Sequence, residues 1–494
     1  TDRQSLRAAG ATSESGMKST SMAFRSNAVE ALHDAQLQAA LDKAQEGSVH
    51  RRATVVSRID EFEQIRRKGE AIKNHTLAHL DYYLERYESE VIRQGGQVHW
   101  AESAEDARRI VSEICRSRQA RLVIKGKSMV SEEVAINGAL EAEGIRVVET
   151  DLGEYILQLA DQPPSHIITP AIHLNREQVS DLFHAHHGEH GFSERQTGVA
   201  ELVNEARQVL RKYFLSADIG ITGANFLIAE TGANVIVTNE GNGDLSSTLP
   251  KVHIVTAGIE KVVPTMDDAG ILLRLLARSA TGQDITSYTT FNAGPRRESD
   301  LDGPEEYHVV LIDNGRSAMI GGRFHEMLRC IRCGACMNHC PVYGAVGGHA
   351  YGWVYPGPMG SVLTPLLTGM DTAYDLPNAC TLNGRCQSVC PVRIPLTDLL
   401  RQHRVGQFSG AITPAYQRWA IRLWTGLARR PRIYQPLSRL AARMLKTLAG
   451  RSGSLTRFPG AGGWTRTRDL PAPEGKTFQQ LWKQHRRAGE GESA

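Results

Sequence analysis

Two cysteine-rich segments constrain this chain more than any other feature. The first is Cys330-Ile-Arg-Cys333-Gly-Ala-Cys336-Met-Asn-His-Cys340-Pro, and the second is Cys380-Thr-Leu-Asn-Gly-Arg-Cys386-Gln-Ser-Val-Cys390-Pro. Seven of the eight cysteines in the 494-residue chain lie in these two segments. The first segment matches the spacing C-x2-C-x2-C-x3-C-P at every position, and thiolates in that spacing bind iron–sulfur clusters.

The spacing also predicts how the ligands are shared. In two-cluster proteins of this kind, the cysteine before the proline ligates the other cluster. We therefore expect a first cluster, of the 4Fe-4S type, whose ligands are Cys330, Cys333, Cys336 and Cys390. The expected ligands of the second cluster are Cys340, Cys380 and Cys386.

The second segment lacks one cysteine of the full pattern. Asn383 stands where C-x2-C-x2-C needs its middle thiolate, and a neutral amide is a poor iron ligand beside thiolates. Three thiolates suit a 3Fe-4S cluster, or a 4Fe-4S cluster with an open or non-cysteine corner. The remaining spacing, C-x5-C-x3-C-P, resembles the three-iron site of the succinate dehydrogenase iron–sulfur subunit.

Zinc and disulfide bonds are the alternatives for clustered cysteines. Paired Cys-x2-Cys segments also form zinc sites, but the x3 spacing and the two prolines fit zinc badly. Disulfide bonds are disfavoured because residues 1–16 are polar and show no apolar core of a secretion signal. No run of 18 apolar residues predicts a transmembrane helix. We therefore expect a protein of the reducing cytoplasm.

Positive charge is concentrated near the C-terminus. The chain has a net charge of +3, yet residues 399–468 contain fourteen Lys or Arg and no Asp or Glu. Such a block indicates an anionic partner, which can be an acidic protein, a membrane surface or a nucleic acid. Arginines interleave there with Trp419, Ile421 and Trp424, a pattern that permits peripheral contact at the inner face of a membrane. More often such a helix packs its apolar stripe on its own domain. No motif that reads a nucleic-acid groove is present, so we expect no nucleic-acid partner.

Hydrophobic periodicity predicts four regions. Residues 1–95 form a polar helical lead-in packed on the next domain, and residues 96–315 form an α/β domain. Residues 316–410 form the cysteine-rich domain, and residues 411–494 form a basic helical extension. In this extension we expect helices at 415–428 and 437–448, with Pro431 and Pro436 as helix breakers.

Strand and helix patterns alternate in the α/β region. This alternation favours a mostly parallel sheet covered on both faces. The expected strands are 97–100, 122–124, 145–149, 219–222, 226–229, 235–238, 252–256 and 307–312. The expected helices are 104–118, 132–143, 176–188, 196–214 and 266–280.

Polar residues that follow these strands are candidates for a binding or catalytic site. Ligands of open α/β sheets bind beyond the carboxyl ends of the strands, which makes Glu230, Glu240 and the segment 239–242 pocket candidates. Hairpin-turn chemistry explains the same residues without any site, and we weight it more heavily. The sequence Gly126-Lys127-Ser128 is not a P-loop, because Arg121 stands where that motif needs its first glycine.

Four histidines, His184, His186, His187 and His190, lie close together in sequence. With Glu189 they match H-x-x-E-H, an inverted zincin pattern. Gly188 and Gly191 weaken the helix that such a zinc site requires, so we favour a helix end with solvated or substrate-facing histidines.

Several segments together resemble the lactate utilization protein B family. The likeness covers about residues 60–480. The segments that carry it are 127–133 (KSMVSEE), 149–154 (ETDLGE), 164–167 (PSHI), 229–232 (AETG), 238–242 (TNEGN) and 347–358 (GGHAYGWVYPGP).

This resemblance implies an LUD domain with a fold like NagB, ribose-5-phosphate isomerase and CoA transferases. It also implies an α-helical ferredoxin-type domain with two clusters and a helical C-terminal extension. The implied activity is electron transfer during oxidation of L-lactate to pyruvate, with a cysteine-rich A-type partner and an LUD-domain C-type partner. The chain departs from the family at Asn383, where cysteine is usual, and at Cys380, where a small residue such as serine is usual.

Two hypotheses follow. The first is an electron-transfer subunit that relays electrons between a lactate-oxidising partner site and an acceptor. The second is an enzyme whose LUD domain has its own acyl, CoA-type or hydroxy-acid site, with Glu230 or Glu240 as the catalytic carboxylate. The sequence contains no G-x-G-x-x-G motif after a strand, so it gives no indication of a bound dinucleotide.

Overall fold

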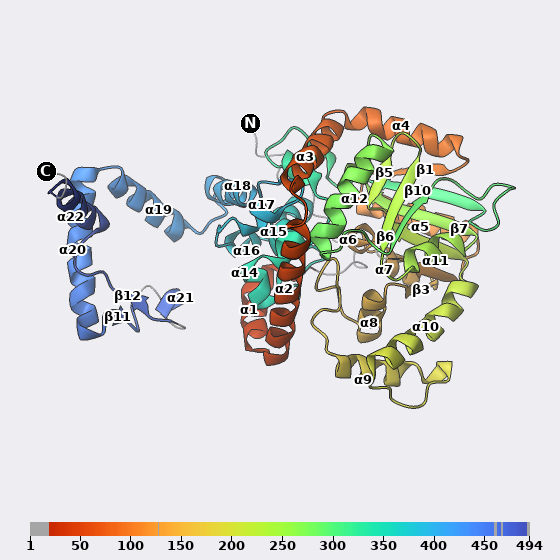
Figure 1. The fold of residues 1–494 in the computed structure, drawn as a ribbon, viewed down its shortest axis with the longest axis horizontal. Coiled ribbons are helices and arrows are strands. Elements are labelled where there is room, and N and C mark those ends of the chain that lie inside the picture. The colour runs from red at the N-terminus through yellow and green to blue at the C-terminus, as the bar shows by residue number, and fades with distance from the viewer. Residues whose placement is uncertain (1–18, 127, 459–461, 466–467, 492–494) are drawn as a thin grey trace. The chain divides into compact units, whose positions relative to one another are not determined.

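The computed structural model describes residues 19–126, 128–458, 462–465 and 468–491. The residues examined for a secretion signal, 1–16, and Lys127 lie outside the described residues. The chain divides into two units, Thr1–Gly406 and Gln407–Ala494, and Figure 1 labels most of their helices and strands.

A six-stranded sheet with only parallel pairings forms the centre of the first unit. Its strands follow the order β1 (Gln97–Ala101), β10 (Glu306–Ile312), β7 (Val252–Gly258), β4 (Ile219–Gly223), β2 (Leu122–Lys125) and β3 (Arg146–Glu149). The expected mostly parallel sheet is confirmed. Because all strands run in one direction, their carboxyl ends meet at one edge.

Helices cover both faces of this sheet, as the strand period of two requires. On one face, Val123 and Val310 share a core with α5 (Ala104–Ser117) and α7 (Ile136–Ala142). The opposite face is covered by α4 (Leu80–Arg93) near β10 and by α8 (Leu152–Ala160), α9 (Arg176–His186) and α10 (Val199–Ser216) near β2.

Two of the expected strands belong to a second, smaller sheet. Its order is β8 (Val262–Val263), β5 (Phe226–Ile228), β6 (Ala233–Thr238) and β9 (Tyr288–Asn292), with β5 and β6 antiparallel. Gly232 closes their turn at a φ of 71°. A Cβ there would lie 2.7 Å from the backbone of Glu90 in α4, so this turn needs glycine. The helices α11 (Asn242–Thr248) and α12 (Met266–Ala280) follow β6 and β8.

The single helix expected at 132–143 is wrong. Two helices occupy this region, α6 (Met129–Glu133) and α7, separated by Ala135 in the left-handed conformation at a φ of 57°. The break lets Glu133 enter a buried ion pair with Arg316 while Asn137 donates to Glu149. Tertiary partners on both sides of the break therefore override the local helical periodicity.

The N-terminal helices are α1 (Phe24–His33), α2 (Ala35–Val56) and α3 (Phe62–Ala78), so the lead-in is helical as expected. They pack on the cysteine-rich segment as well as on α12. The Gln38 amide donates to the carbonyl of Ala345 at 2.9 Å, and the Arg66 guanidinium donates to that of Cys390 at 2.7 Å.

Short helices carry the cysteine-rich segment. They are α13 (Ala335–Asn338), α14 (Pro341–Val346), α15 (Gly357–Leu367), α16 (Asp375–Asn378), α17 (Arg385–Val389) and α18 (Leu396–Ser409). Pro341 begins α14 with Cys340 at its N-cap, a position at which proline's missing N–H costs nothing.

The second unit is mainly helical. It contains α19 (Ala415–Ala428), α20 (Pro431–Ala449), α21 (Gly462–Thr465), α22 (Phe478–Gly491) and a two-stranded sheet of β11 (Ser454–Leu455) and β12 (Leu470–Pro471). Pro436 was expected to break a helix, but it lies inside α20. It removes only one backbone hydrogen bond near the start of this helix.

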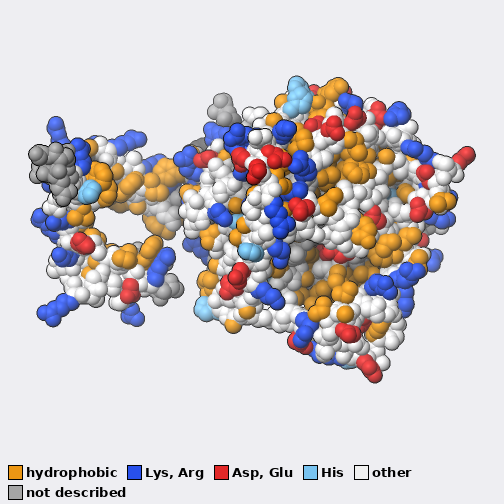
Figure 2. Space-filling model, in the orientation of Figure 1, with side chains coloured by type: hydrophobic (Ala, Val, Ile, Leu, Met, Phe, Trp, Pro, Cys, Tyr) orange, Lys and Arg blue, Asp and Glu red, His pale blue; other side chains and the backbone are white. Residues whose placement is uncertain are grey.

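Basic and apolar side chains lie side by side on the second unit (Figure 2). On α19, Trp419 and Trp424 are 67% and 62% exposed, so this helix does not bury its apolar stripe within its own unit. In the described part of the chain, no helix combines the length and the hydropathy needed to span a bilayer.

Candidate iron–sulfur centre and adjoining cavity

Four cysteine sulfurs surround one small cavity in the first unit. Cys330, Cys333, Cys336 and Cys390 line it, together with apolar side chains from the same segments. Burial, and then the charges of Cys390 and Cys330, raises the pKa of Cys333 to about 12. Buried thiols of this kind ionise only when a positive centre stabilises the thiolates. The cavity thus brings together the four residues expected around the first cluster.

The other three cysteines form a second set. Burial, and then the charges of Cys380 and Cys340, raises the pKa of Cys386 to about 12. The two sets are neighbours, because burial and the charges of several cysteines, Cys386 among them, raise the pKa of Cys336. No three His, Cys, Asp or Glu side chains of the described residues are placed to share a single metal ion.

Backbone N–H groups point at the sulfurs of both sets. The N–H groups of Arg332 and Leu382 donate to Cys330 and Cys380 at 3.4 and 3.3 Å. Both donors adopt a left-handed backbone, with φ values of 58° and 57°. The same turn is therefore built twice, and N–H groups that donate to sulfur favour an anionic cluster.

Asn383 takes the position of Cys333 in the second turn. Its side-chain oxygen accepts the backbone N–H of Arg385 at 2.9 Å, just as the Cys333 sulfur accepts the N–H of Ala335. The amide therefore preserves the loop without supplying a thiolate. The surrounding residues Thr381, Leu382, Asn383 and Arg385 are exposed.

Arginines from outside the two segments approach the cysteine backbone. The Arg52 guanidinium donates to the carbonyl of Val389 at 3.0 Å, and that of Arg404 donates to the carbonyl of Cys380. Arg66 binds the Cys390 carbonyl, as described above. These positive charges, the N–H donors and the enclosed sulfurs all fit an anionic iron–sulfur cluster.

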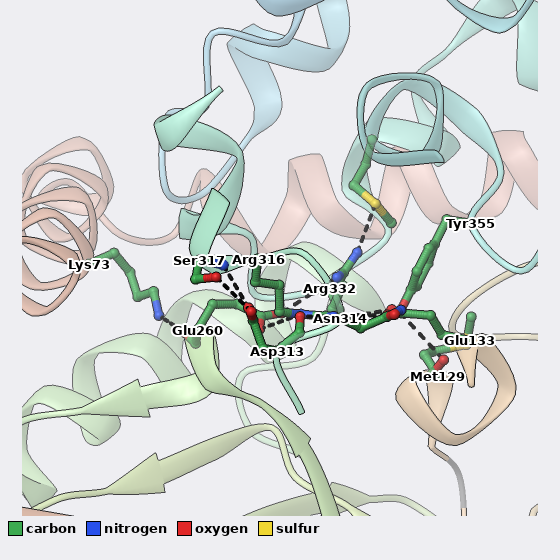
Figure 3. A network of polar contacts seen from close by, with 11 residues as sticks. Lys73, Met129, Glu133, Glu260, Asp313, Asn314, Arg316, Ser317, Arg332 and Tyr355 are labelled. Atoms are coloured by element: carbon green, nitrogen blue, oxygen red, sulfur yellow. Dashed lines mark hydrogen bonds and ion pairs between the residues drawn. The ribbon is translucent and has the colours of Figure 1, made fainter. Parts of the chain in front are cut away.

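The Arg332 side chain leads from the first sulfur set toward the α/β domain. Its guanidinium lies 4.3 Å from the ring centre of Tyr355 and donates to the Met359 sulfur at 3.0 Å. On its other side it lies 3.5 Å from the carboxylate of Glu260, which follows β7. One cation therefore touches both the cluster segment and the end of a central strand (Figure 3).

A buried charged network continues from Glu260 (Figure 3). Arg316 pairs with Glu133 at 2.6 Å and with Glu260 at 2.8 Å, and the Tyr355 hydroxyl donates to Glu133 at 2.6 Å. Burial raises the pKa of Glu260, but the guanidinium groups of Arg316 and Arg332 outweigh burial and lower this pKa to about 2. The network therefore holds its charges at neutral pH and joins the cluster segment to the sheet.

A cavity of about 170 Å³ lies at the carboxyl edge of the parallel sheet. Gly126, Thr222 and Thr256 line it from the ends of β2, β4 and β7, and the side chains of Lys261 and Arg332 also contribute. Burial, and then the charge of Arg332, lowers the pKa of Lys261 to about 8. The cavity therefore brings two cations, Lys261 and Arg332, together with the carboxylates of Asp151 and Glu240 at the place where α/β sheets bind ligands.

Glu230 and Glu240, the two carboxylates expected at this edge, lie in different surroundings. Glu240 is exposed and lines the cavity, whereas the Glu230 carboxylate accepts the N–H of Met266 at the start of α12 at 3.1 Å. Glu230 therefore caps a helix, and the cavity lining does not include it. A catalytic role for either residue stays a prediction.

A second cavity, of about 580 Å³, is acidic. Glu132, Glu141 and Glu154 are among its lining residues. The buried Lys125 ammonium pairs with Glu132 and, at 2.9 Å, with Glu149. An anion would be repelled here, so this cavity does not compete with the first as a site for carboxylates.

The histidines of residues 184–190 do not form a metal site in the part of the chain that the structure describes. His187 is buried and bonds the Tyr155 hydroxyl at 3.0 Å and the Glu205 carboxylate at 2.8 Å. His190 lies 3.2 Å from the Tyr213 hydroxyl, beyond the end of α9. His187 thus has the partners of a core histidine, a role that the sequence pattern did not indicate.

Known protein families match three successive regions of the chain. Family models match residues 84–312 as an LUD domain, residues 326–394 as a 4Fe-4S dicluster domain and residues 400–487 as the C-terminal region of lactate utilisation protein B. Lactate utilization protein B from Lysinibacillus sphaericus is 43% identical, over 97% of this chain and 100% of that protein. The Macrococcus caseolyticus protein is 44% identical, over 92% and 95%. This chain belongs to the lactate utilization protein B family.

Membership of the lactate utilization protein B family confirms the expected fold class, an α/β LUD domain followed by an α-helical ferredoxin-type domain for two clusters. It supports iron–sulfur clusters as the cofactors. A crystal structure of a DUF162 family protein from Deinococcus radiodurans matches 47% of this chain and 98% of its own at 14% identity. Its TM-score of 0.27 is too low to carry an argument.

Sequence reasoning missed the buried network in this family member. Two of the family-like segments contain Glu133 and Tyr355, but nothing in the pattern indicated that these residues meet. A signal did exist at β7, where Glu260 and Lys261 follow an apolar strand almost directly. Charged residues at the carboxyl end of a buried strand are candidates for a site.

Proposed function

We propose that this protein is an iron–sulfur electron-transfer subunit in the oxidation of L-lactate to pyruvate. The main support is the arrangement of seven cysteines in two neighbouring sets. One set is enclosed beside the α/β domain, and the other lies under an exposed loop. The dicluster match and relatives that are named for lactate utilization also support the proposal.

In this proposal, Cys330, Cys333, Cys336 and Cys390 hold a 4Fe-4S cluster. Cys340, Cys380 and Cys386 hold a second cluster, which is either 3Fe-4S or 4Fe-4S with an open or non-cysteine corner. The shared cavity supports the first set, and the place of Asn383 in the second turn supports the missing thiolate. When bound, such clusters carry electrons singly, at potentials set by hydrogen bonds to sulfur, nearby charge and exposure.

The partners follow from the proposed role. In this role, Cys330, Cys333, Cys336 and Cys390 would hold the cluster that accepts electrons from lactate oxidation at a partner site, and Cys340, Cys380 and Cys386 would hold the cluster from which electrons leave. We propose a cysteine-rich A-type subunit and an LUD-domain C-type subunit as partners. The basic, partly apolar surface of α19 and α20 supports contact with an acidic protein or with the inner face of the membrane, in a cytoplasmic location.

Metal analysis and low-temperature EPR of anaerobically purified full-length protein test this proposal. We expect a brown protein with iron, acid-labile sulfide and at least one cluster signal. The Cys115→Ala variant, which changes the buried eighth cysteine in α5, should retain both clusters. A colourless preparation loaded with zinc would end the proposal.

The alternative, an LUD-domain enzyme with a carboxylate nucleophile, depends on Glu240, which lines the cavity. Hydroxylamine trapping of an acyl-enzyme after incubation with acyl-CoA tests it. An adduct that Glu240→Gln abolishes would support the alternative, and the absence of any adduct would count against it.

A further inference from the structure

The cavity at the carboxyl edge of the parallel sheet has no assigned ligand. Its strongest feature is Lys261, whose side chain is 6% exposed and lines the cavity. Among the described residues, no hydrogen bond or ion pair accounts for its ammonium group. The charges of Glu260 and Cys330 attract this nearly buried ammonium group, and a bound anion would add the hydrogen-bonded partner that it lacks.

The glutamates of the buried network near Lys261 are bound to other cations. The carboxylates of Glu260 and Glu133 are engaged with Arg316 and Arg332. The buried Lys73 ammonium donates to the backbone carbonyl of Glu260. The carboxylates of the network are ion-paired with arginines, whereas Lys261 is attracted by Glu260 without an ion pair to it and can therefore bind an incoming anion.

The size of the cavity limits the class of ligand. Its volume of about 170 Å³ is below the roughly 300–1,000 Å³ of pockets for drug-sized molecules. Ser128, Thr222 and Thr256 line the cavity beside apolar Ile168 and Leu276. The Ser128 and Thr256 hydroxyls bond each other and that of Thr222 bonds His253, so a ligand oxygen would join these hydrogen bonds. A small carboxylate with one further oxygen and a short apolar group matches this lining.

The cavity and the first sulfur set share a wall. Arg332 and Ile167 line both the cavity and the space between Cys330, Cys333, Cys336 and Cys390. A ligand held by Lys261 would thus be separated from the first cluster by a single layer of side chains. No other cavity described above has this relation to the sulfurs.

From this geometry we infer that the cavity binds a small 2-hydroxy- or 2-oxocarboxylate, with its carboxylate on Lys261 and Arg332 directly beside the first cluster. The inference rests on the proposed electron-transfer function but places a substrate or product site on this chain itself, where the proposed function placed it on a partner. Lys261 is then a binding residue, and the Arg332 guanidinium is held in place by Tyr355, Met359 and Glu260.

An alternative role for Lys261 is to offset the negative charge of the first cluster. The two roles predict different effects on carboxylate binding when Lys261 is replaced by a neutral side chain. Loss of a ligand contact weakens carboxylate binding, and because the charge of Lys261 acts on Cys330, its removal also lowers the cluster potential. Loss of charge compensation lowers the cluster potential and leaves binding unchanged, because a nearby cation favours the more negative, reduced cluster.

Isothermal titration of anaerobically purified full-length protein with L-lactate, and separately with pyruvate, is the test. We expect Lys261→Met to weaken carboxylate binding at least about tenfold, with unchanged iron content and EPR spectrum. The matched control is Lys251→Met, an exposed lysine just before β7 at the opposite edge of the sheet, and it should bind as the unmodified protein does. Lactamide, which lacks the charge, should bind weakly and equally to all three proteins.

A second variant keeps the test decisive if Lys261→Met does not fold. Ala280→Leu adds bulk to the cavity lining at the end of α12 without changing charge, and we expect it to weaken L-lactate binding while iron is retained.

Three outcomes would overturn the inference: no binding by iron-loaded unmodified protein, unchanged binding in both variants, or a shifted cluster potential alone in Lys261→Met. Each of these leaves the proposed function standing. Absence of iron would instead overturn the proposed function, while titration of the iron-free protein would still test the cavity.

Discussion

The two cysteine turns have the same backbone and opposite surroundings. In the first, Ile331 is 2% exposed and Arg332 reaches into the network of the α/β domain. In the second, the corresponding residues Thr381 and Leu382 are exposed, Leu382 by 38%. Both turns rely on a left-handed residue whose N–H donates to a cysteine sulfur.

This difference teaches that the local motif specifies ligand geometry, whereas the packing around it specifies what each site can contact. The first turn is enclosed and shares a wall with the cavity at the sheet edge, and in the proposed function it is the place where electrons enter. The second turn faces solvent and can approach another protein, so it suits their exit. Four predictions test this contrast.

The largest expected effect comes from removing one thiolate of each set. We expect Cys333→Ser to lose the first cluster, and because Cys333 and Cys386 are both buried, a serine at either position should lower the melting temperature of the protein. Cys386→Ser should lose only the second cluster's EPR signal, and lactate-dependent reduction should fall at least about a hundredfold in both. Loss of both cluster signals in the Cys386→Ser variant would contradict the separation of the two sets.

The buried network should matter to the first site only. Glu133→Gln leaves Arg316 without its bidentate partner, and breaking such a buried pair costs about 3–5 kcal/mol. We expect a lower urea midpoint and an altered EPR signal for the first cluster, with the second unchanged. The exposed pair of Arg109 and Glu113 supplies the control, since Glu113→Gln should change neither measurement. A shift in the second cluster's signal would argue against the separation of the two sites.

Asn383→Cys should make the second turn more like the first. The new thiol replaces the amide that now accepts the N–H of Arg385, so the turn can keep its shape. We expect a gain of about one iron atom per chain and a signal typical of a 4Fe-4S cluster. If iron content and spectrum stay as they are, the second cluster already has a full ligand set.

The smallest expected effect concerns the exposed surface of the second turn. Leu382→Asp should leave both clusters intact but weaken docking of an electron acceptor at this loop. Contacts of this size contribute about 0.5–1 kcal/mol, which corresponds to about two- to fivefold slower transfer in stopped-flow measurements. Leu301→Asp, at a fully exposed site elsewhere, is the control and should transfer electrons at the original rate.

Much of the fold could be predicted from the sequence because its signals are local. The strands of the parallel sheet and most of its helices follow from period and apolar content, and the cysteine spacing pointed to the residues that now line one cavity. Predictions failed where distant residues decide local structure. Ala135 breaks a helix because Glu133 and Asn137 have separate tertiary partners, and Pro436 is tolerated inside α20.

By itself the sequence determined the ligand chemistry: the number and spacing of thiolates, the amide in place of one of them and the apolar strands. Only the tertiary structure decided which cations stand beside the sulfurs. Lys261 follows a strand and Arg332 lies between two cysteines, more than seventy positions further along the chain. They line one cavity because the parallel sheet collects its strand ends at one edge and the cysteine segment packs against that edge.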